Sequence, residues 1–332
     1  MLYSQAELIK HHRELKGMTQ AQLAEGICSR FHIVKAEAGT RKLSDFTFKD
    51  VLLKLGLNPR DFNVGINTED NDTLFYLQME EAMRNPDYLT SKEKCIQIKN
   101  DIDNYLSGLK EEPANPTHWK ELKLHAEIFI HMTRADSQYK PIIIMSDVLK
   151  VRECATEAIK LFRPDFDLDK IETYYLTRRE YGLLNTIAAT YRYTDDVQKN
   201  VEILEKLKAN FEKHNKNFYE NRDLNEFYSI LIGNIGIGYK FLDMWEKALE
   251  LNTYSMKLSS DTSNFIVYAQ SLYNKADALM KLGRTDEGKE HFKRFFMYII
   301  ALGDGYGGWD ISQLKKMYED EFGGTIDIMA DW

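Results

Sequence analysis

Residues 18–37 of this chain read MTQAQLAEGICSRFHIVKAE. Thr19, followed three residues later by Gln22, predicts a capped helix start, because the two side chains can satisfy free amide groups of the first turn. Gly26 then stands where the chain must leave the helix through a left-handed backbone conformation, which favours glycine. Ser29 offers the N-cap of a second helix. The stretch therefore predicts two short helices joined by a tight turn.

Apolar residues recur at helical spacing through both of these helices, at Leu23, Ala24, Ile27, Ile33 and Ala36. This spacing turns them inward and leaves an outer face on the second helix, made of Arg30, Phe31, Val34 and Lys35. A helix-turn-helix of this shape presents its second helix to a DNA major groove.

The flanking sequence completes a small helical domain. Ser4 and Glu7 predict a capped first helix that Gly17 ends, and Ser44 or Asp45 begins a later helix that Gly56 ends. Asn58-Pro59 predicts one more short turn of helix at 60–62. We expect a five-helix DNA-binding domain over residues 1–65.

Charge is divided unevenly along the chain. Residues 1–66 contain 10 Lys and Arg against 7 Asp and Glu, and the remaining residues contain 34 against 45. A mildly basic head on an acidic body suits a small nucleic-acid module carried by a domain that does not touch DNA. The net charge of +3 on residues 1–66 is by itself equally compatible with a domain that does not bind nucleic acid.

The three cysteines (Cys28, Cys95 and Cys154) are far apart and form no CxxC pair, which favours a reducing compartment over a disulfide framework or a zinc site. The first residues lack the pattern of a signal peptide. The most apolar stretch, 295–302, is too short to cross a bilayer. We expect a cytoplasmic protein with no membrane partner.

Residues 63–72 are polar and rich in Asn and Gly, so we expect an interdomain linker, placed at 66–72, and a second domain over 73–332. The second domain has helical periodicity almost throughout. Amphipathic runs fall at 73–84, 91–109, 117–134, 146–162, 169–191, 196–214, 223–241, 244–258, 264–282, 285–302 and 311–322.

Two of these runs carry a similar pattern about forty residues apart. Asn234, Gly236 and Tyr239 precede Ala248, and Asn274, Ala276 and Leu279 precede Gly288 and Phe292. The pattern resembles the tetratricopeptide repeat, in which small residues let paired helices approach closely. Such pairs stack into a right-handed α-solenoid with a concave groove. The expected fold class is all-α.

The helix-turn-helix resembles the repressor type (XRE/Cro) at Thr19-Gln20, Leu23-Ala24, Ile33, Lys35, Glu37, Gly39 and Arg41. Its Gly-Ile-Cys-Ser turn resembles that of the RNPP group (Rgg/PlcR/PrgX-like) of peptide-pheromone receptors. The resemblance implies a structural pair between Arg13 and Glu37 and a phosphate contact by Gln20. It also implies base contacts by Arg30, Phe31 and Lys35. Ala36 and Ala38 depart from this pattern, since larger residues are common there.

The chemistry of these side chains agrees with the implied roles. Arg30 can donate two parallel hydrogen bonds to guanine, and Phe31 can contact a thymine methyl group. Further contacts to DNA, mainly to phosphates, are expected from Ser29, Thr40, Arg41 and Lys42. His32 is either a phosphate contact or a packed surface residue. For Arg30 and Lys35 the alternative is a solvated surface charge.

Three asparagines, Asn185, Asn234 and Asn274, each precede the small packing position of a first helix by two residues. A carboxamide can donate to and accept from the backbone of an extended peptide. In the RNPP group groove asparagines hold short signalling peptides, and the resemblance implies this role here. Arg178, Tyr181 and Tyr239 are further candidates beside such a peptide. The alternative is hydrogen bonding between helices inside the array.

No pairing of a nucleophile with a base is visible, the histidines have the wrong spacing for a helical zinc site, and no cofactor is implied. We expect a non-enzymatic transcription regulator of the quorum-sensing type. Its expected partners are double-stranded DNA, a short signalling peptide and a second copy in a homodimer. The alternatives are a regulator whose repeats bind a protein partner, and a repeat scaffold that does not bind DNA.

Overall fold

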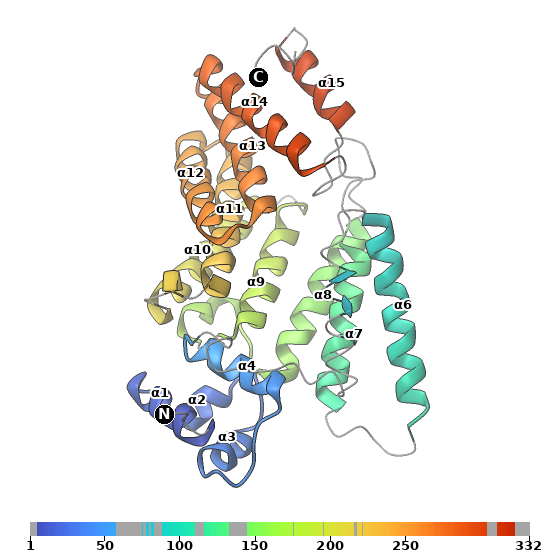
Figure 1. Ribbon diagram of the computed structural model, residues 1–332, viewed down its shortest axis with the longest axis vertical. Coiled ribbons are helices and arrows are strands. Elements are labelled where there is room, and N and C mark those ends of the chain that lie inside the picture. Colours follow the sequence, from blue (N-terminus) through green and yellow to red (C-terminus); the bar gives the residue numbers. More distant parts are fainter. Residues whose placement is uncertain are drawn as a thin grey trace.

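The computed structural model describes residues 5–57, 75, 78–79, 81–82, 88–109, 116–132, 145–174, 176–194, 196–215, 218–220, 222–303 and 311–322. Every regular element within these ranges is a helix and none is a strand, so the all-α fold class is confirmed. The molecule is elongated, with a small N-terminal head at one end and a stack of helices that continues to the other end (Figure 1).

Four short helices build the head: α1 (Gln5–Leu15), α2 (Gln20–Ala24), α3 (Arg30–Glu37) and α4 (Asp45–Lys54). They enclose a small core around Ile9, Leu23, Ile33 and Leu52, none of which is exposed to solvent. The expected cap at Ser4, the short helix at 60–62 and the linker at 66–72 lie outside the described residues.

The ends of the head helices follow the sequence closely. Thr19 and Gln22 form the expected capping box, and Gly26 has a φ of 77°. Ser29 is the N-cap residue of α3, but its hydroxyl makes no capping hydrogen bond and instead lies 3.2 Å from His32 Nδ1. The predicted N-cap position at Ser29 is therefore confirmed, while its hydroxyl contacts the imidazole of His32 in place of a backbone amide of the first turn.

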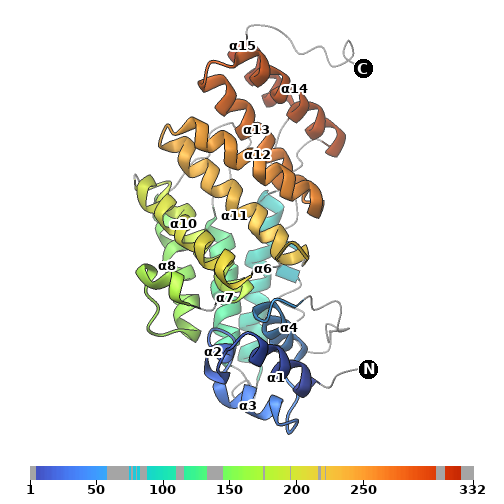
Figure 2. The same ribbon diagram turned by 90° about the vertical axis from the view of Figure 1, so that its left-hand side faces the viewer.

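Most of the body is made of long helices packed in sequence order (Figure 2). They are α6 (Tyr88–Ser107), α7 (Pro116–His131), α8 (Met145–Phe162), α9 (Arg178–Tyr191), α10 (Val197–His214), α11 (Arg222–Phe241), α12 (Trp245–Thr262), α13 (Phe265–Lys281), α14 (Thr285–Leu302) and α15 (Ile311–Phe322). Two 3₁₀ turns, η2 (Leu168–Thr173) and η3 (Phe218–Glu220), complete it. The expected run at 73–84 lies mostly outside the described residues.

The expected continuous helix at 169–191 is wrong. The chain forms η2 first, passes through extended backbone at Tyr174, and begins α9 only after Thr177. Thr177 and Glu180 form a capping box that starts α9 afresh, with Thr177 N donating to Glu180 Oε2 at 2.8 Å. A Thr-x-x-Glu spacing signals such a start, so this boundary was visible in the sequence.

The expected break at 259–261 also lies too early. Helix α12 continues to Thr262, and the turn comes at Ser263, whose φ is 58°. Ser259 Oγ donates to Ser255 O at 2.8 Å within the helix, so its polar side chain is satisfied without a turn. Asn264 then caps α13.

Close helix packing depends on small residues at the positions that the repeat pattern marks. A Cβ at Gly236 of α11 would lie 2.6 Å from Asn252 Nδ2 of α12, and one at Gly288 of α14 would lie 3.0 Å from Ala276 O of α13. Ala248 of α12 is fully buried. These contacts make the body a solenoid of tetratricopeptide-like helix pairs. Among the described helices, none combines the length and apolar character needed to span a lipid bilayer.

Candidate functional site

A polar cluster inside the head fixes α3 against α1 and α2. Arg13 Nε donates to Glu37 Oε1 at 2.5 Å and Arg13 Nη2 donates to Glu37 Oε2 at 2.9 Å, so the expected pair forms with two parallel bonds. Hydrogen bonding to Glu37 raises the pKa of Arg13 above its usual value. Gln20 Nε2 also donates to Glu37 Oε2, at 2.9 Å. The Gln20 amide keeps one N–H for the phosphate contact that the sequence analysis assigns to it.

Helix α3 lies at the head end of the molecule, far from the C-terminal helices of the body (Figure 2). Arg30 is exposed, Phe31 has 59% of its surface exposed, and Val34 has 36%. Lys35 Nζ lies 4.3 Å from the centre of the Phe31 ring, over its face. A large exposed aromatic ring beside two cations fits a surface that contacts a partner.

The turn after α3 adds further cations at the same end of the head. Arg41 and Lys42 are exposed, and Thr40 Oγ1 donates to Lys35 O at 3.1 Å, which ties the turn to the end of α3. Ser29 is exposed and His32 is partly buried, next to each other at the start of α3. Every residue that the sequence predicts to contact DNA is thus at least partly exposed, and Gln20 is also held by Glu37.

A groove of about 470 Å³ opens on the inner side of the solenoid. Helices α9, α11 and α13, which are successive neighbours, supply most of its lining, and the ends of α7 and α8 close one side. Asn185, Asn234 and Asn274 all line this groove. The structure thus brings together three side chains that lie up to 89 positions apart in the chain.

The three carboxamides differ in their surroundings. Asn234 Nδ2 donates to Asn185 Oδ1 at 3.0 Å, and both side chains are partly exposed. Asn274 is only 5% exposed, and its Oδ1 accepts a hydrogen bond from Lys240 Nζ at 3.3 Å. The bond between Asn185 and Asn234 joins two helices, which agrees with the alternative prediction of hydrogen bonding inside the array. The bond lies on the wall of the groove, however. Both amides keep unused hydrogen-bonding capacity toward the groove.

The rest of the groove lining contains both apolar and polar side chains. Apolar side chains come from Ile230, Ile237 and Ile266, and polar ones from Thr186, Glu226 and Gln270. Arg192, just after α9, also lines the groove, and its buried Nε has no hydrogen-bond partner among the described residues. Arg192 is not predicted from the sequence, since a cation after a helix is an ordinary C-terminal residue.

Two tyrosines that the sequence analysis placed beside the peptide lie elsewhere. Tyr181 is 1% exposed, its ring packs against Phe211 and Phe227, and its hydroxyl donates to Asn210 Oδ1 at 2.6 Å. Tyr239 packs against the central core, and its hydroxyl donates to Glu205 Oε1 at 3.0 Å. Neither lines the groove, because the face of each helix that carries them turns toward α10. The side chain of Arg178 lies outside the described residues.

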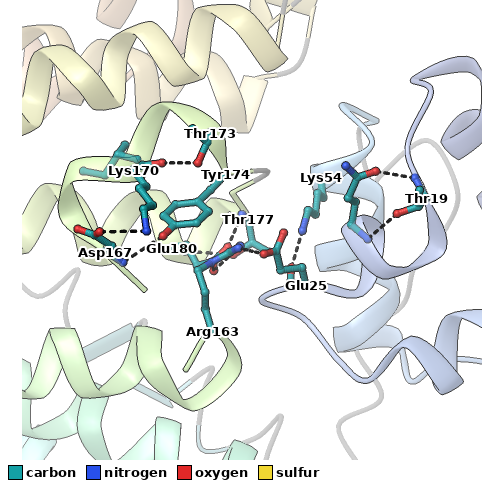
Figure 3. A network of polar contacts seen from close by, with 12 residues as sticks. Thr19, Glu25, Lys54, Arg163, Asp167, Lys170, Thr173, Tyr174, Thr177 and Glu180 are labelled. Atoms are coloured by element: carbon teal, nitrogen blue, oxygen red, sulfur yellow. Dashed lines mark hydrogen bonds and ion pairs between the residues drawn. The ribbon is translucent and has the colours of Figure 1, made fainter. Parts of the chain in front are cut away.

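The buried side chain of Arg163 joins the head to the body (Figure 3). Arg163, 4% exposed at the end of α8, pairs with Glu25 of the head and with Glu180 of α9, its Nη2 lying 3.1 Å from Glu180 Oε1. Lys54 Nζ of α4 donates to Glu25 O. These contacts place the turn of the helix-turn-helix directly on the start of α9.

A second ion-pair set lies beside the first. Arg179 of α9 pairs with Asp50 of α4, with 3.2 Å between Nη2 and Oδ2, and with Glu121 of α7. Burial raises the pKa of Asp50, and Arg179 opposes that rise. The same cation and burial lower the pKa of His125 to about 4, with burial the larger cause. His125 therefore stays neutral near pH 7 and adds no charge to the junction.

Gly26 is required at this junction for two reasons. Its φ of 77° lies in the left-handed region, and a Cβ there would overlap the carboxylate of Glu180. The sequence predicted the first reason only, because the second depends on a residue 154 positions away. Within the described ranges, no group of three or more His, Cys, Asp or Glu side chains is placed to hold a metal ion.

No known family profile and no curated protein matches this sequence. Solved structures with a similar arrangement include PlcR of Bacillus thuringiensis in complex with the peptide PapR7 and DNA, which is 17% identical. That match covers 97% of this chain and 99% of PlcR, with a TM-score of 0.49. ComR of S. thermophilus, in complex with DNA and its signalling peptide ComS, is 12% identical over 96% of this chain and 98% of ComR, with a TM-score of 0.45. BtubC from P. vanneervenii is 12% identical over 72% of this chain and 93% of BtubC, with a TM-score of 0.43.

Proposed function

We propose that this protein is a transcription regulator of the peptide-responsive kind. Its head binds duplex DNA through α3, and a short extended peptide bound in the groove of the solenoid controls that binding. The observation that carries the proposal is the combination of an exposed aromatic and cationic face on α3 with a groove in which three asparagines converge.

The outer face of α3 suits a major groove in size and chemistry. Arg30 would read guanine, Phe31 would contact a thymine methyl group, and Lys35 would lie against a base edge or a phosphate. Gln20, Thr40, Arg41 and Lys42 would bind phosphates on both sides, with Ser29 and His32 at the start of the helix. The Arg13–Glu37 pair would keep α3 rigid while it binds.

The groove suits an extended main chain. Amides at Asn185, Asn234 and Asn274 would bond to peptide N–H and C=O groups at successive helices. Ile230, Ile237 and Ile266 would take apolar side chains of the peptide. Because main-chain bonds carry no information on side chains, these isoleucines would set much of the specificity.

Helix α9 supplies a physical route between the two sites. Arg179 at its start pairs with Asp50 of the head, the Glu180 carboxylate lies beside Gly26, and Asn185 lies one and a half turns further along, in the groove. A peptide that shifts α9 would therefore shift the surface on which the head rests. Such a peptide acts as a switch only if it binds one head position more tightly than the other.

We also propose a cytoplasmic homodimer. A single helix-turn-helix reads too few base pairs for high specificity, and two-fold dimers place recognition helices about 34–36 Å apart on successive major grooves. Light scattering on the purified chain tests the dimer. A mass of one chain, 38.8 kDa, at micromolar concentration contradicts it.

The main test selects duplexes from a random DNA pool with the purified protein, then measures their affinity for the R30A/K35A variant. Lys257→Ala on α12 is the matched control, because it removes an exposed cation from the body. We expect loss of binding in the first variant alone. If no duplex is selected, the repeat scaffold is the better interpretation, and equal binding by all three proteins would place the DNA contact away from Arg30 and Lys35.

The second test screens a library of synthetic seven-residue peptides against the protein and measures calorimetrically how each binder changes operator affinity. Peptides that bind wild type but not N185A/N234A support the groove. If no peptide binds while a cellular protein binds the groove, the regulator acts through a protein partner instead.

A further inference from the structure

A second cavity, of about 640 Å³, lies between the head and the body. The head contributes the end of α1 (Leu15 and Lys16) and the end of α4 (Lys54, Leu55 and Gly56). The body contributes Leu176 before α9, the end of α10 (Lys213, His214 and Asn215), Phe218 of η3 and Leu224 in the first turn of α11. Its volume falls in the range of about 300–1,000 Å³ that is usual for small-molecule sites.

Three lysines line this cavity, and no Asp or Glu is present among its described lining residues. Lys16 Nζ donates to main-chain oxygens, at 3.2 Å to His214 O and 3.5 Å to Lys54 O. Lys54 is 5% exposed, and its Nζ donates to the main-chain oxygen of Glu25. Carbonyl oxygens satisfy the N–H groups of these amines without neutralising their charge.

The charge of Lys54 is balanced, because Glu25 and Glu180 lie near it and together with Arg163 and Lys54 they carry no net charge. Lys16 lies outside this set, and among the described residues its amine bonds to carbonyl oxygens and to no carboxylate, so its charge is left in excess. His214 is neutral near pH 7, because burial and the neighbouring lysines lower its pKa to about 4. Burial likewise lowers the pKa of Lys16 and of Lys54 to about 8. A buried cation without an anion is costly, and an anion beside it removes that cost.

Much of the remaining cavity lining is apolar. Leu55, Leu176 and Leu224 are buried, Phe218 is partly buried, and Leu15 has 68% of its surface exposed at the rim. An occupant that bonds to the amines would therefore place its remaining atoms against leucine and phenylalanine side chains.

We propose that this cavity binds a small amphipathic anion, with a carboxylate or phosphate group between Lys16 and Lys54 and an apolar chain against Leu55, Leu176 and Leu224. Because the cavity is formed by both domains, the bound anion holds the head on the body. This site is separate from the peptide groove and does not depend on it.

Calorimetric titration of the full-length protein tests the site, with octanoate, octyl phosphate, inorganic phosphate and octanol as probes. We expect both amphipathic anions to bind, and the tighter of the two identifies the anionic group. Inorganic phosphate and octanol should bind at least about tenfold more weakly, since each lacks one of the two interactions. Equal binding of octanol, or no binding of either amphipathic anion at millimolar concentration, overturns the proposal.

The variant Lys16→Met keeps the length of the side chain and removes its charge, and it should weaken octanoate binding by about tenfold or more. Lys257→Met on α12 is the matched control and should change nothing. Unchanged octanoate affinity in Lys16→Met overturns the site.

A measurement on the wild-type protein covers the case in which the variant misfolds. Near pH 8 the two buried amines are partly deprotonated, and a bound anion favours their charged form, so binding takes up protons. The binding enthalpy should then vary with the ionisation enthalpy of the buffer at pH 8 and vary less at pH 6. A binding enthalpy that is the same in all buffers at pH 8 contradicts an anion beside these lysines.

Discussion

Asn234 of α11 donates a hydrogen bond of 3.0 Å to Asn185 of α9, on the wall of the groove that runs along the inner side of the solenoid. The bond holds the two carboxamides side by side and fixes the orientation of their remaining N–H and C=O groups. It also makes the position of α9 relative to α11 depend on two side chains that a ligand can reach.

Replacement of Asn234 by Ala should weaken binding of a groove peptide by about tenfold, because hydrogen bonds to the peptide and the orientation of Asn185 are both lost. Folding should change little, since the side chain is partly exposed. Calorimetry with a peptide selected by the wild-type protein measures the effect. Asn104→Ala, at an exposed position of α6, is the control, and equal affinities in the two variants would remove Asn234 from the peptide site.

Replacement of Arg30 by Ala should cost about 1–3 kcal/mol of DNA-binding free energy and relax the preference at one base pair, as expected for a base contact. Lys42→Ala should lower the affinity for all duplexes alike. It should also reduce the slope of log affinity against log salt concentration by about 1, as expected for a phosphate contact. Fluorescence anisotropy over a salt series separates the two effects. If Arg30→Ala lowers affinity for every sequence equally, Arg30 contacts the backbone instead.

The pair Gly26→Ala and Gly17→Ala isolates the contact between head and body. Both glycines have a positive φ, at 77° and 63°, so alanine strains each by about 1 kcal/mol. A Cβ at Gly17 meets no atom within 4 Å, whereas one at Gly26 overlaps Glu180. Gly26→Ala should therefore lower the denaturation midpoint more than Gly17→Ala does. Equal effects would mean that Glu180 can move aside at no cost.

Removal of Arg163 should destabilise the junction strongly. Arg163→Met leaves Glu180 buried without its cation, and breaking a buried pair in this way costs about 3–5 kcal/mol. Chemical denaturation with separate probes in head and body should show the head losing its protection first. Arg284→Met, which breaks the exposed pair with Glu287, should produce no measurable change. Identical denaturation curves for wild type and Arg163→Met would contradict the assigned role.

Stability should rise with pH above neutrality because of Lys16 and Lys54. Each has a pKa near 8 in the folded protein against an ordinary value of 10.5, so between these values the unfolded chain binds more protons. The free energy of unfolding therefore increases as pH rises through 8 toward 10.5. Denaturant midpoints at pH 7, 8 and 9 measure this, and K16M/K54M should show a smaller increase. The same increase in both proteins would place its origin elsewhere.

The sequence by itself determined the head helices and much of the body. Thr19, Gln22, Gly17, Gly26 and Gly56 act through local backbone geometry, and each ends or begins a helix where it was expected. Helix periodicity placed the long body helices, because a buried apolar face imposes its spacing on any amphipathic helix. The start of α9 at Thr177 also depends on local sequence, but it was not predicted, because the apolar periodicity continues across this boundary.

Only the tertiary structure decided which side chains meet. Asn185 and Asn234 lie in one groove, whereas Tyr181 and Tyr239, on the same two helices, pack into the core and against α10. The contacts of Gly26 with Glu180 and of Lys16 with His214 join residues more than 150 positions apart. Spacing along a helix defines its faces, but the neighbours of each face depend on how the helices stack. That stacking is set by packing across the whole solenoid rather than by any short stretch of the chain.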